Sequence, residues 1–309
     1  MLPYILVAFL LGILFIHLYF RIARSYEIVD KPNKRSSHLE PTLRGGGIIF
    51  PILCIVMNLI LFALDRGSVS LWFLFGLLLI GGISFWDDVK TLSPMIRVLF
   101  HIAAVMLMFW QTGLLELHML TIVIGFVLVI GSINAYNFMD GINGITTLYS
   151  LVAVGTLHFL MPEMNLEFVL VALLIFAFYN IRKKAVCFIG DVGSVSLAYI
   201  IAFCIAKLIV DTQNVKWILL LGVYGIDSVV TILYRLNRNE NIFKPHRTHL
   251  YQYLANEKGL SHVGVSTIYA LAQLALNVVV IQYGFTLGLL TFGVMVLIYL
   301  VVRIRLKLD

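Results

Sequence analysis

The chain has 309 residues, of which 61% are hydrophobic and only 12% are charged, and its formal net charge is +6. Ordinary soluble domains carry about 25% charged residues, so this composition excludes such a domain and indicates helices embedded in lipid. The positive charge is first a signal of membrane topology, and it does not indicate a nucleic-acid partner.

Apolar runs with the length that a helix needs to cross the hydrocarbon core recur along the whole chain. The first run starts at Met1 with no basic region before it, so we expect a retained helix and no cleaved signal peptide. The seventh run is short. The eleven predicted spans are 2–20, 47–64, 69–86, 95–111, 119–136, 145–161, 168–180, 195–211, 217–234, 262–283 and 285–302.

The loops between these spans predict the orientation of the chain in the membrane. Alternation of the spans places 19 of the 22 Lys and Arg residues on one side, in segments 21–46, 87–97, 180–194, 235–261 and 303–309. Basic loops stay on the cytoplasmic side, so we expect a periplasmic N-terminus and a cytoplasmic C-terminus. The sequence therefore predicts an all-α polytopic bundle of about 10–11 transmembrane helices, with one domain over residues 1–309.

The first polar segment runs from Asp30 to His38 and leads into Pro41, Thr42, Arg44 and the glycines 45–47 at the mouth of the second span. Glycines allow a backbone to approach a ligand closely, and N–H groups at a helix start favour anions. The segment thus suits a phosphate, with Gly45 and Gly46 against it. A basic loop at the membrane edge is the plainer alternative, since a glycine triplet alone is weak evidence.

The second segment, Asp87-Asp88-Val89-Lys90, ends the third span. Two adjacent carboxylates repel one another, and a divalent cation or an ammonium group relieves that repulsion. One carboxylate could instead act as a base. A solvated helix end paired with Lys90 explains the same residues equally well.

The third segment places Asn134, Asn137 and Asp140 at intervals of three residues, followed by Gly141 and Gly144. On a helix these polar side chains form one slowly drifting stripe, which is unfavourable against lipid. A polar seam between helices is the alternative. The segment 134–145 is therefore a candidate active-site loop.

The fourth segment, Phe188-Ile189-Gly190-Asp191, begins the eighth span shortly after the basic residues 182–184. Asp191 at a helix start could hold Mg²⁺ beside phosphates, and Phe188 could stack on a base. An ordinary helix cap formed by Asp191 or Ser194 is the competing interpretation.

The fifth segment contains His246, Arg247 and His249, which suit an anionic substrate, and Arg247 could contact a phosphate through two N–H groups. The two histidines lack a nearby third ligand for zinc. Asp227 lies inside the ninth span, where a carboxylate either serves function or pairs with a polar group of a neighbouring helix.

Taken in this order, the five segments resemble the polyprenyl-phosphate N-acetylhexosamine-1-phosphate transferase family from about Asp30 to Gln252. Members of this family use Mg²⁺, with Mn²⁺ as a substitute, a UDP-N-acetylhexosamine donor and undecaprenyl phosphate. The resemblance implies a multi-pass enzyme of the bacterial inner membrane with its active site on the cytoplasmic side. Association into a homo-oligomer stays open.

The resemblance also implies roles for particular residues. Asp191 is expected to bind the metal, with Asp87 or Asp88 as further ligands. The expected catalytic residues are Asp87, Asp88, Asp140, His246, Arg247 and His249. The expected substrate-binding residues are Pro41, Thr42, Arg44, Gly45, Gly46, Lys90, Asn134, Asn137, Asn180 and Phe188.

The pattern of residues 30–38, followed by Pro41, Thr42, Arg44 and the glycines 45–47, resembles the branch that starts O-antigen or another surface polysaccharide more than the one that makes peptidoglycan lipid I. Two departures from the family pattern also matter. Asn143 stands where many members carry a second aspartate, and residues 246–249 lack consecutive histidines. N-acetylglucosamine is the default sugar, with N-acetylquinovosamine and N-acetylfucosamine as alternatives. Direct attack by the lipid phosphate and a covalent aspartyl intermediate both stay open. A secondary transporter and a catalytically silent scaffold are the competing classes, although transporters place key charges near the midplane.

Overall fold

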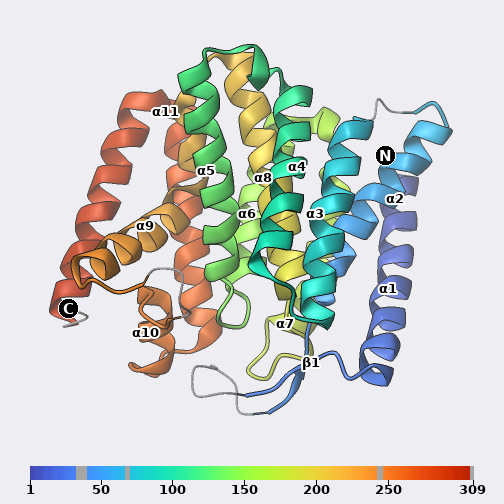
Figure 1. Ribbon diagram of the computed structural model, residues 1–309, viewed down its shortest axis with the longest axis horizontal. Coiled ribbons are helices and arrows are strands. Elements are labelled where there is room, and N and C mark those ends of the chain that lie inside the picture. Colours follow the sequence, from blue (N-terminus) through green and yellow to red (C-terminus); the bar gives the residue numbers. More distant parts are fainter. Residues whose placement is uncertain (33–39, 67–69, 242–245, 307–309) are drawn as a thin grey trace.

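The computed structural model of the protein describes residues 1–32, 40–66, 70–241 and 246–306. In these ranges it is helical apart from a two-stranded antiparallel sheet, in which Val29 pairs with Leu43 and Asp30 with Thr42 (Figure 1). Parts of the first and fifth polar segments, 33–39 and 242–245, lie outside the described residues. The elements are α1 (Leu2–Ser25), β1 (Val29–Asp30), β2 (Thr42–Leu43), η1 (Gly46–Ile48), α2 (Ile49–Ala63), α3 (Leu71–Val89), α4 (Pro94–Thr112), η2 (Leu114–Glu116), α5 (Met119–Phe138), α6 (Ile145–Leu160), η3 (Pro162–Met164), α7 (Glu167–Asn180), α8 (Gly190–Thr212), η4 (Val215–Leu221), α9 (Gly222–Asn237), α10 (Leu250–Asn256) and α11 (His262–Arg305).

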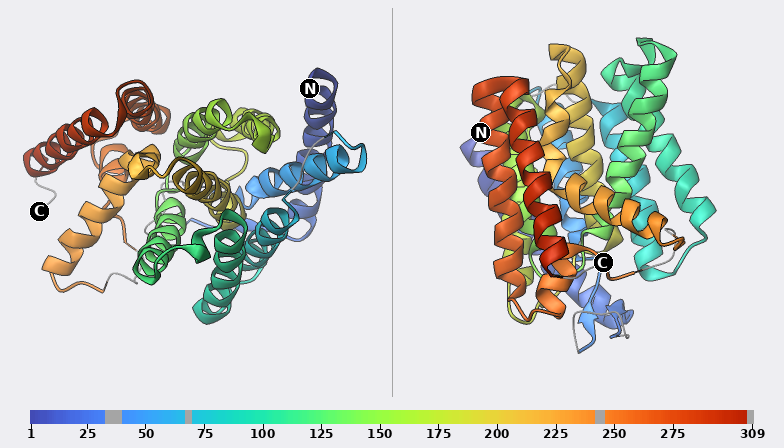
Figure 2. Two further views of the ribbon diagram at one scale, coloured as in Figure 1. Left: turned by 90° about the horizontal axis from the view of Figure 1, so that it is seen from above. Right: turned by 90° about the vertical axis from the view of Figure 1, so that its left-hand side faces the viewer.

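Each of the eleven predicted spans forms helix, which confirms the all-α class. The described residues contain eight helices, however, that are long and apolar enough to cross a membrane. The count is lower because α6 and α7 have only 16 and 14 residues, and because the last two predicted spans form the single helix α11. This helix turns back at Gly284, whose φ of 83° is not helical, and Figure 2 shows its two arms side by side.

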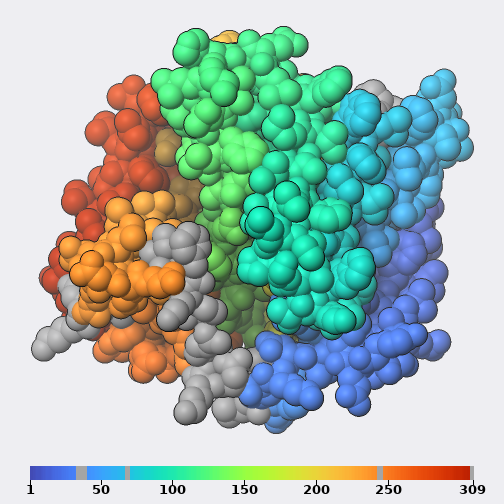
Figure 3. Space-filling model, in the orientation of Figure 1, coloured from blue at the N-terminus to red at the C-terminus, as the bar shows by residue number. Residues whose placement is uncertain are grey.

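The helix α8 forms the centre of the bundle. It is buried along almost its whole length and packs against α3 and α5. By contrast, α5 buries only Ile133 and Tyr136, and its exposed apolar side chains face outward beside α4 in Figure 3. A helix that is apolar on an exposed face is stable when that face meets lipid. The outer helices thus present a lipid-facing surface around a protein-packed core.

The loops that carry the five polar segments all lie at one end of the bundle, the lower end in Figure 1. The end of α11 lies at this end as well, whereas the start of α1 lies at the opposite end. Segments that are far apart in the sequence are therefore gathered at one face.

The ninth predicted span is interrupted between η4 and α9. A glutamine of α11 forms hydrogen bonds with the backbone groups next to this break. The buried Gln273 side chain donates to the carbonyl of Leu219 at 3.0 Å and accepts from the N–H of Val223 at 2.9 Å. It also accepts from the hydroxyl of Tyr149 at 2.6 Å. Backbone groups inside a membrane protein must find internal partners, so Gln273 keeps this break stable.

Substitution of Gln273 by leucine should therefore destabilise the protein. Each buried polar group left without a partner costs about 1–3 kcal/mol, and this variant leaves at least two. We expect a clear fall in the thermal unfolding midpoint of the detergent-solubilised protein. The matched control is Gln282→Leu on the same helix, because Gln282 is exposed and should tolerate the change. Equal midpoints for the two variants would show that the break does not depend on Gln273.

Candidate active site

The first loop is joined to the start of α8 by backbone contacts. The N–H of Phe188 donates to the carbonyl of Leu43 at 2.7 Å, and the N–H groups of Gly46 and Gly47 donate to the carbonyls of Phe188 and Ile189 at 3.0 and 2.9 Å. A Cβ atom on Gly190, whose φ is +74°, would lie 2.7 Å from the Cα atom of Gly45. These positions need glycine because two backbones meet there.

This geometry corrects the expectation that the glycine triplet cradles a phosphate. Gly45, Gly46 and Gly47 are buried, and the N–H groups of the last two are already bonded to protein carbonyls. The triplet thus packs the loop against α8. Of the other residues in this loop, Pro41 is exposed and Thr42 is half-buried in β2.

Asp88 caps the N-terminus of α8 from the end of α3. Its Oδ1 accepts from the N–H of Asp191 and its Oδ2 from the N–H of Val192, both at 2.9 Å. The first N–H groups of a helix have no partner within the helix, and a carboxylate there also meets the positive end of the helix dipole. Asp88 therefore fixes α8 relative to α3.

Two arginines bridge the three carboxylates of the site. The Nε of Arg44 lies 2.7 Å from Oδ1 of Asp88, and its Nη2 lies 2.8 Å from Oδ1 of Asp191. The Nη1 of Arg97 lies 2.9 Å from Oδ2 of Asp87 and 3.4 Å from Oδ2 of Asp191. Burial lowers the pKa of Arg44, but the carboxylates of Asp88 and Asp191 more than offset this and raise it. Both guanidinium groups thus lie against a concentrated negative charge.

Arg97 is a site residue that the sequence did not single out. The sequence does contain an indication of its role, because Arg97 is a basic residue one turn into an apolar helix that starts with the capping pair Ser93-Pro94. Lys90, which was expected at the site, is instead exposed and makes no ion pair within the described part of the chain. Asp87 is held by Arg97 and by the N–H of Leu92, which lies 2.7 Å from its Oδ1.

The turn after α5 brings a fourth carboxylate towards this cluster. Asp140 is half-buried and accepts from the hydroxyl of Thr146 at 2.8 Å. Loss of hydration raises the pKa of Asp140 to about 7, and the negative charges of Asp191 and Asp88 contribute to the rise. The side chain of Asn137 accepts from the hydroxyl of Ser194 at 2.8 Å, which ties the end of α5 to α8.

The raised pKa of Asp140 predicts a pH-dependent stability. The pKa in the folded protein lies above the value of about 3.9 in an unfolded chain, so folding takes up a proton between these values and stability falls as the pH rises through this window. Asp140→Asn lacks this proton. The free energy of unfolding of Asp140→Asn, relative to that of the wild type, should therefore rise by on the order of 2 kcal/mol from about pH 5 to about pH 8. Thermal unfolding of both proteins checks this, and a constant difference would contradict it.

Two other asparagines of the predicted site have different surroundings from those expected. Asn134 is exposed and donates to the carbonyl of Ile130 in its own helix at 2.9 Å, so it lies away from the carboxylates. Asn180 is buried, accepts from the N–H of Gly144 at 2.8 Å and donates to the carbonyl of Cys187 at 3.0 Å. Asn180 therefore links two loops of the site. Phe188, by contrast, is half-exposed, as a stacking residue should be.

The fifth segment docks against the Asp140 turn. The hydroxyl of Tyr251 donates to the carbonyl of Phe138 at 2.9 Å, and its ring lies against Gly141, where any Cβ atom would collide with it. His246 and Arg247 are half-buried, whereas His249 is buried. Burial lowers the pKa of His246 to about 4, so this side chain is neutral at physiological pH. The segment thus forms a second cluster beside the arginine-bridged one.

The chemistry of the carboxylates fits a magnesium ion. No group of three or more His, Cys, Asp or Glu side chains in the described ranges forms a ready-made metal cage. Mg²⁺ is usually held by one or two carboxylates together with substrate phosphates and waters, so such a cage is not required. The Asp191 side chain is 17% exposed, against 8% for Asp87 and 0% for Asp88. Asp191 is thus the carboxylate that a metal could reach most easily.

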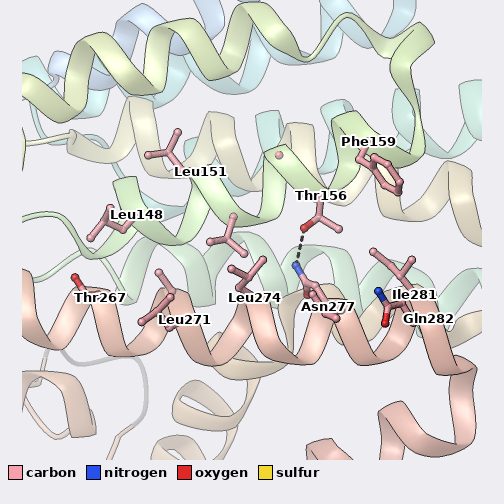
Figure 4. Close-up of a pocket in the computed structure, with 14 residues that line it drawn as sticks. Leu148, Leu151, Thr156, Phe159, Thr267, Leu271, Leu274, Asn277, Ile281 and Gln282 are labelled. Atoms are coloured by element: carbon pink, nitrogen blue, oxygen red, sulfur yellow. Dashed lines mark hydrogen bonds between the residues drawn. The ribbon is translucent and has the colours of Figure 1, made fainter.

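A groove of about 610 Å³ lies apart from these residues, between α6 and α11 (Figure 4). It follows nearly the whole length of α6, from Leu148 to Phe159, and its lining is mostly apolar. A hydrogen bond of 2.9 Å from Asn277 to Thr156 crosses it. None of the site carboxylates or arginines lines the groove, so it is no candidate for the donor site.

The model of the glycosyl transferase family 4 matches residues 70–209. This stretch includes the acid pair of α3, Arg97, the Asp140 turn and Asp191. The chain is thus similar to glycosyl transferase family 4 over this central stretch. This confirms the resemblance stated from the motifs, and the protein is therefore an enzyme.

Three relatives are similar to this chain over more than half of its length. It is 25% identical to a probable undecaprenyl-phosphate N-acetylglucosaminyl 1-phosphate transferase of Bacillus subtilis, over 90% of this chain and 84% of the relative. It is 26% identical to the undecaprenyl-phosphate alpha-N-acetylglucosaminyl 1-phosphate transferase of Escherichia coli, over 79% and 73%. It is 29% identical to the phospho-N-acetylmuramoyl-pentapeptide-transferase of Streptococcus thermophilus, over 64% and 66%.

Proposed function

We propose that this enzyme transfers an N-acetylhexosamine 1-phosphate from a UDP-sugar to undecaprenyl phosphate and releases UMP. The product would start an O-antigen or another surface polysaccharide. Residues 1–309 would act as one transferase domain, because a contiguous cluster of buried apolar residues joins α1 to the first arm of α11.

The observation that carries this proposal is the convergence of Arg44, Asp87, Asp88, Arg97 and Asp191 at one end of the bundle. These residues come from the first loop, α3, α4 and α8. Phosphoryl transfer depends mainly on positioning and charge neutralisation, so cations and carboxylates for a metal must meet at one point. In the proposed orientation this cluster would lie at a membrane face, where a lipid phosphate and a soluble nucleotide can both arrive.

In the proposed reaction an oxygen of the lipid phosphate attacks the β-phosphorus of the UDP-sugar. A phosphorus–oxygen bond to the lipid phosphate forms, the bond between the two phosphates of the donor breaks, and UMP leaves. Arg44 and Arg97 would turn from their carboxylates towards the donor phosphates and neutralise them. A bound Mg²⁺, held by Asp191, would neutralise further charge on the diphosphate.

The hydrogen bonds of the acid pair favour direct attack over a covalent aspartyl intermediate. Both oxygens of Asp88 and both oxygens of Asp87 already accept hydrogen bonds or ion pairs. A carboxylate engaged in this way is a poor nucleophile. Asp140, whose pKa of about 7 suits a proton acceptor at neutral pH, would take a proton from the lipid phosphate.

The reaction is tested with membranes that contain the protein, undecaprenyl phosphate, Mg²⁺ and one UDP-N-acetylhexosamine at a time. UMP release that requires both lipid and Mg²⁺ is the expected result. UDP-N-acetylglucosamine is the first donor to try, because two of the relatives carry that sugar in their names. Turnover of the UDP-N-acetylmuramoyl-pentapeptide alone would instead assign the chain to peptidoglycan synthesis.

The orientation with loops in the cytoplasm is part of this proposal and has its own test. Cys54, Cys187 and Cys204 are buried, so a cysteine introduced at an exposed position is labelled selectively. Lys90 is exposed just after the end of α3, and Arg66 is exposed just after the end of α2. These two positions lie at opposite ends of the bundle. A charged maleimide that cannot cross the membrane should label Arg66→Cys in intact spheroplasts and Lys90→Cys only in inverted vesicles. The reverse pattern would overturn the proposed orientation.

A further inference from the structure

Asp227 is buried in α9, and the proposed reaction does not use it. Its carboxylate is nevertheless surrounded by donors. It accepts from Nδ1 of His249 at 3.0 Å, from the hydroxyl of Tyr269 at 2.5 Å and from the hydroxyl of Tyr299 at 3.1 Å. The remaining donors are the hydroxyl of Thr231 and the N–H groups of Leu250 and Tyr251. A carboxylate with this many donors is held as an anion.

A buried arginine balances that charge through a tyrosine. Nη1 of Arg303 donates to the hydroxyl of Tyr299 at 3.2 Å, and this hydroxyl in turn donates to Asp227. The Arg303 guanidinium also lies 4.6 Å from the centre of the Tyr234 ring. The cluster around Asp227 thus contains a cation other than His249.

The contact with Asp227 decides which nitrogen of His249 carries the proton. A carboxylate only accepts hydrogen bonds, so Nδ1 must be the protonated nitrogen. The Nε2 atom is buried and has no hydrogen-bond partner in the described part of the chain. The ring is also fixed by stacking, with His246 at 5.0 Å and Tyr251 at 5.6 Å between ring centres.

The same segment is fixed to the Asp140 turn. Tyr251 bonds to Asp227 through its N–H and to the carbonyl of Phe138 through its hydroxyl. Asp227 thus sets both the ring orientation of His249 and the position of the segment against the carboxylate cluster.

We propose that Asp227 is a positioning residue that holds His249 with Nδ1 protonated and Nε2 free for a substrate phosphate. This inference rests on the proposed function. In it Nε2 of His249 accepts a hydrogen bond from a singly protonated phosphate, whose second pKa is about 6. The intramembrane carboxylate is thereby connected to the reaction through His249.

The inference predicts that the effects of Asp227 and His249 are not additive. Asp227→Asn should lower kcat about 10- to 100-fold and leave KM for the UDP-sugar within about twofold, the loss typical of a residue that orients another ligand. In a His249→Ala background the same change should alter kcat less than about twofold. The control is Asp211→Asn, because Asp211 is exposed and, in the described part of the chain, pairs with Lys207 alone. An unchanged kcat for Asp227→Asn, or an equal loss in the His249→Ala background, would overturn the inference.

A measurement without substrate keeps the inference testable if Asp227→Asn does not fold. In protein labelled with ¹⁵N-histidine, the His249 resonances are assigned by their loss in His249→Gln. Nδ1 should be the protonated nitrogen in the wild type, and protonation at Nε2 alone would overturn the inference. This measurement does not depend on turnover. A wild type that releases no UMP would therefore contradict the proposed function without deciding the state of His249.

Discussion

Asp191→Asn should lower kcat for UMP release by about 10²- to 10³-fold while the protein keeps its fold. Asp191 is the most accessible of the three clustered carboxylates, and both arginines meet at it. An amide of the same shape keeps the packing but removes the charge that a metal and the arginines require. The lower kcat should appear at every Mg²⁺ concentration, or the Mg²⁺ concentration that gives half-maximal activity should be much higher than in the wild type.

The loss must be separated from a general effect of removing a carboxylate. Asp211→Asn removes an exposed carboxylate of the same helix and should retain wild-type turnover. A readout without turnover is the rise of the unfolding midpoint with added Mg²⁺, which binding to the folded state produces. The rise should be present in the wild type and absent in Asp191→Asn. Activity within a few fold of wild type, with the same response to Mg²⁺, would remove Asp191 from the metal site.

The second large effect is expected at Arg44, whose guanidinium joins the first loop to α3 and α8. Lysine keeps the charge, but its single ammonium group cannot reproduce a planar bridge between Asp88 and Asp191. We expect Arg44→Lys to lower kcat/KM about 100-fold. Arg44→Ala should also lower the free energy of unfolding by about 2–4 kcal/mol, because the fully buried side chain of Asp88 loses its partner cation.

The exposed pair of Lys184 with Glu40 supplies the matched control for Arg44. Its side chains are 80% and 69% exposed, so Lys184→Ala should change stability by less than about 1 kcal/mol. Steady-state kinetics and thermal unfolding of the three variants measure both effects. If Arg44→Lys behaves like Lys184→Ala, the bridge seen in the structure has no part in turnover.

Much of the fold could be predicted from the sequence, because hydrophobic length and helix period are local properties. The eleven apolar segments correspond to helices, and the motifs gather at one end as alternation of the spans requires. The number of complete spans could not be predicted, since a hydropathy pattern does not show that α6 and α7 are too short or that α11 turns at Gly284.

Side-chain directions at the site depend on contacts that no local pattern contains. The stripe of Asn134, Asn137 and Asp140 drifts by about 60° at each step of three residues, and this drift carries Asn134 away from the site. Asn137 reaches α8, and Asp140 faces the cluster. The amides of Gly46 and Asn180 are engaged by carbonyls or N–H groups from other loops. The pairing of Arg97 with Asp191 likewise arises only when α4 and α8 meet.

Transfer of the β-phosphate is the central claim, and it can be followed directly. Purified protein is incubated with UDP-N-acetylglucosamine labelled with ³²P at the β-phosphate, undecaprenyl phosphate and Mg²⁺, and the lipid is then extracted. The account predicts that the label enters the lipid fraction in equal amount to the UMP released, and that Asp191→Asn abolishes both. Label that stays in UDP while sugar reaches the lipid, or label released as free sugar phosphate or inorganic phosphate, would contradict it.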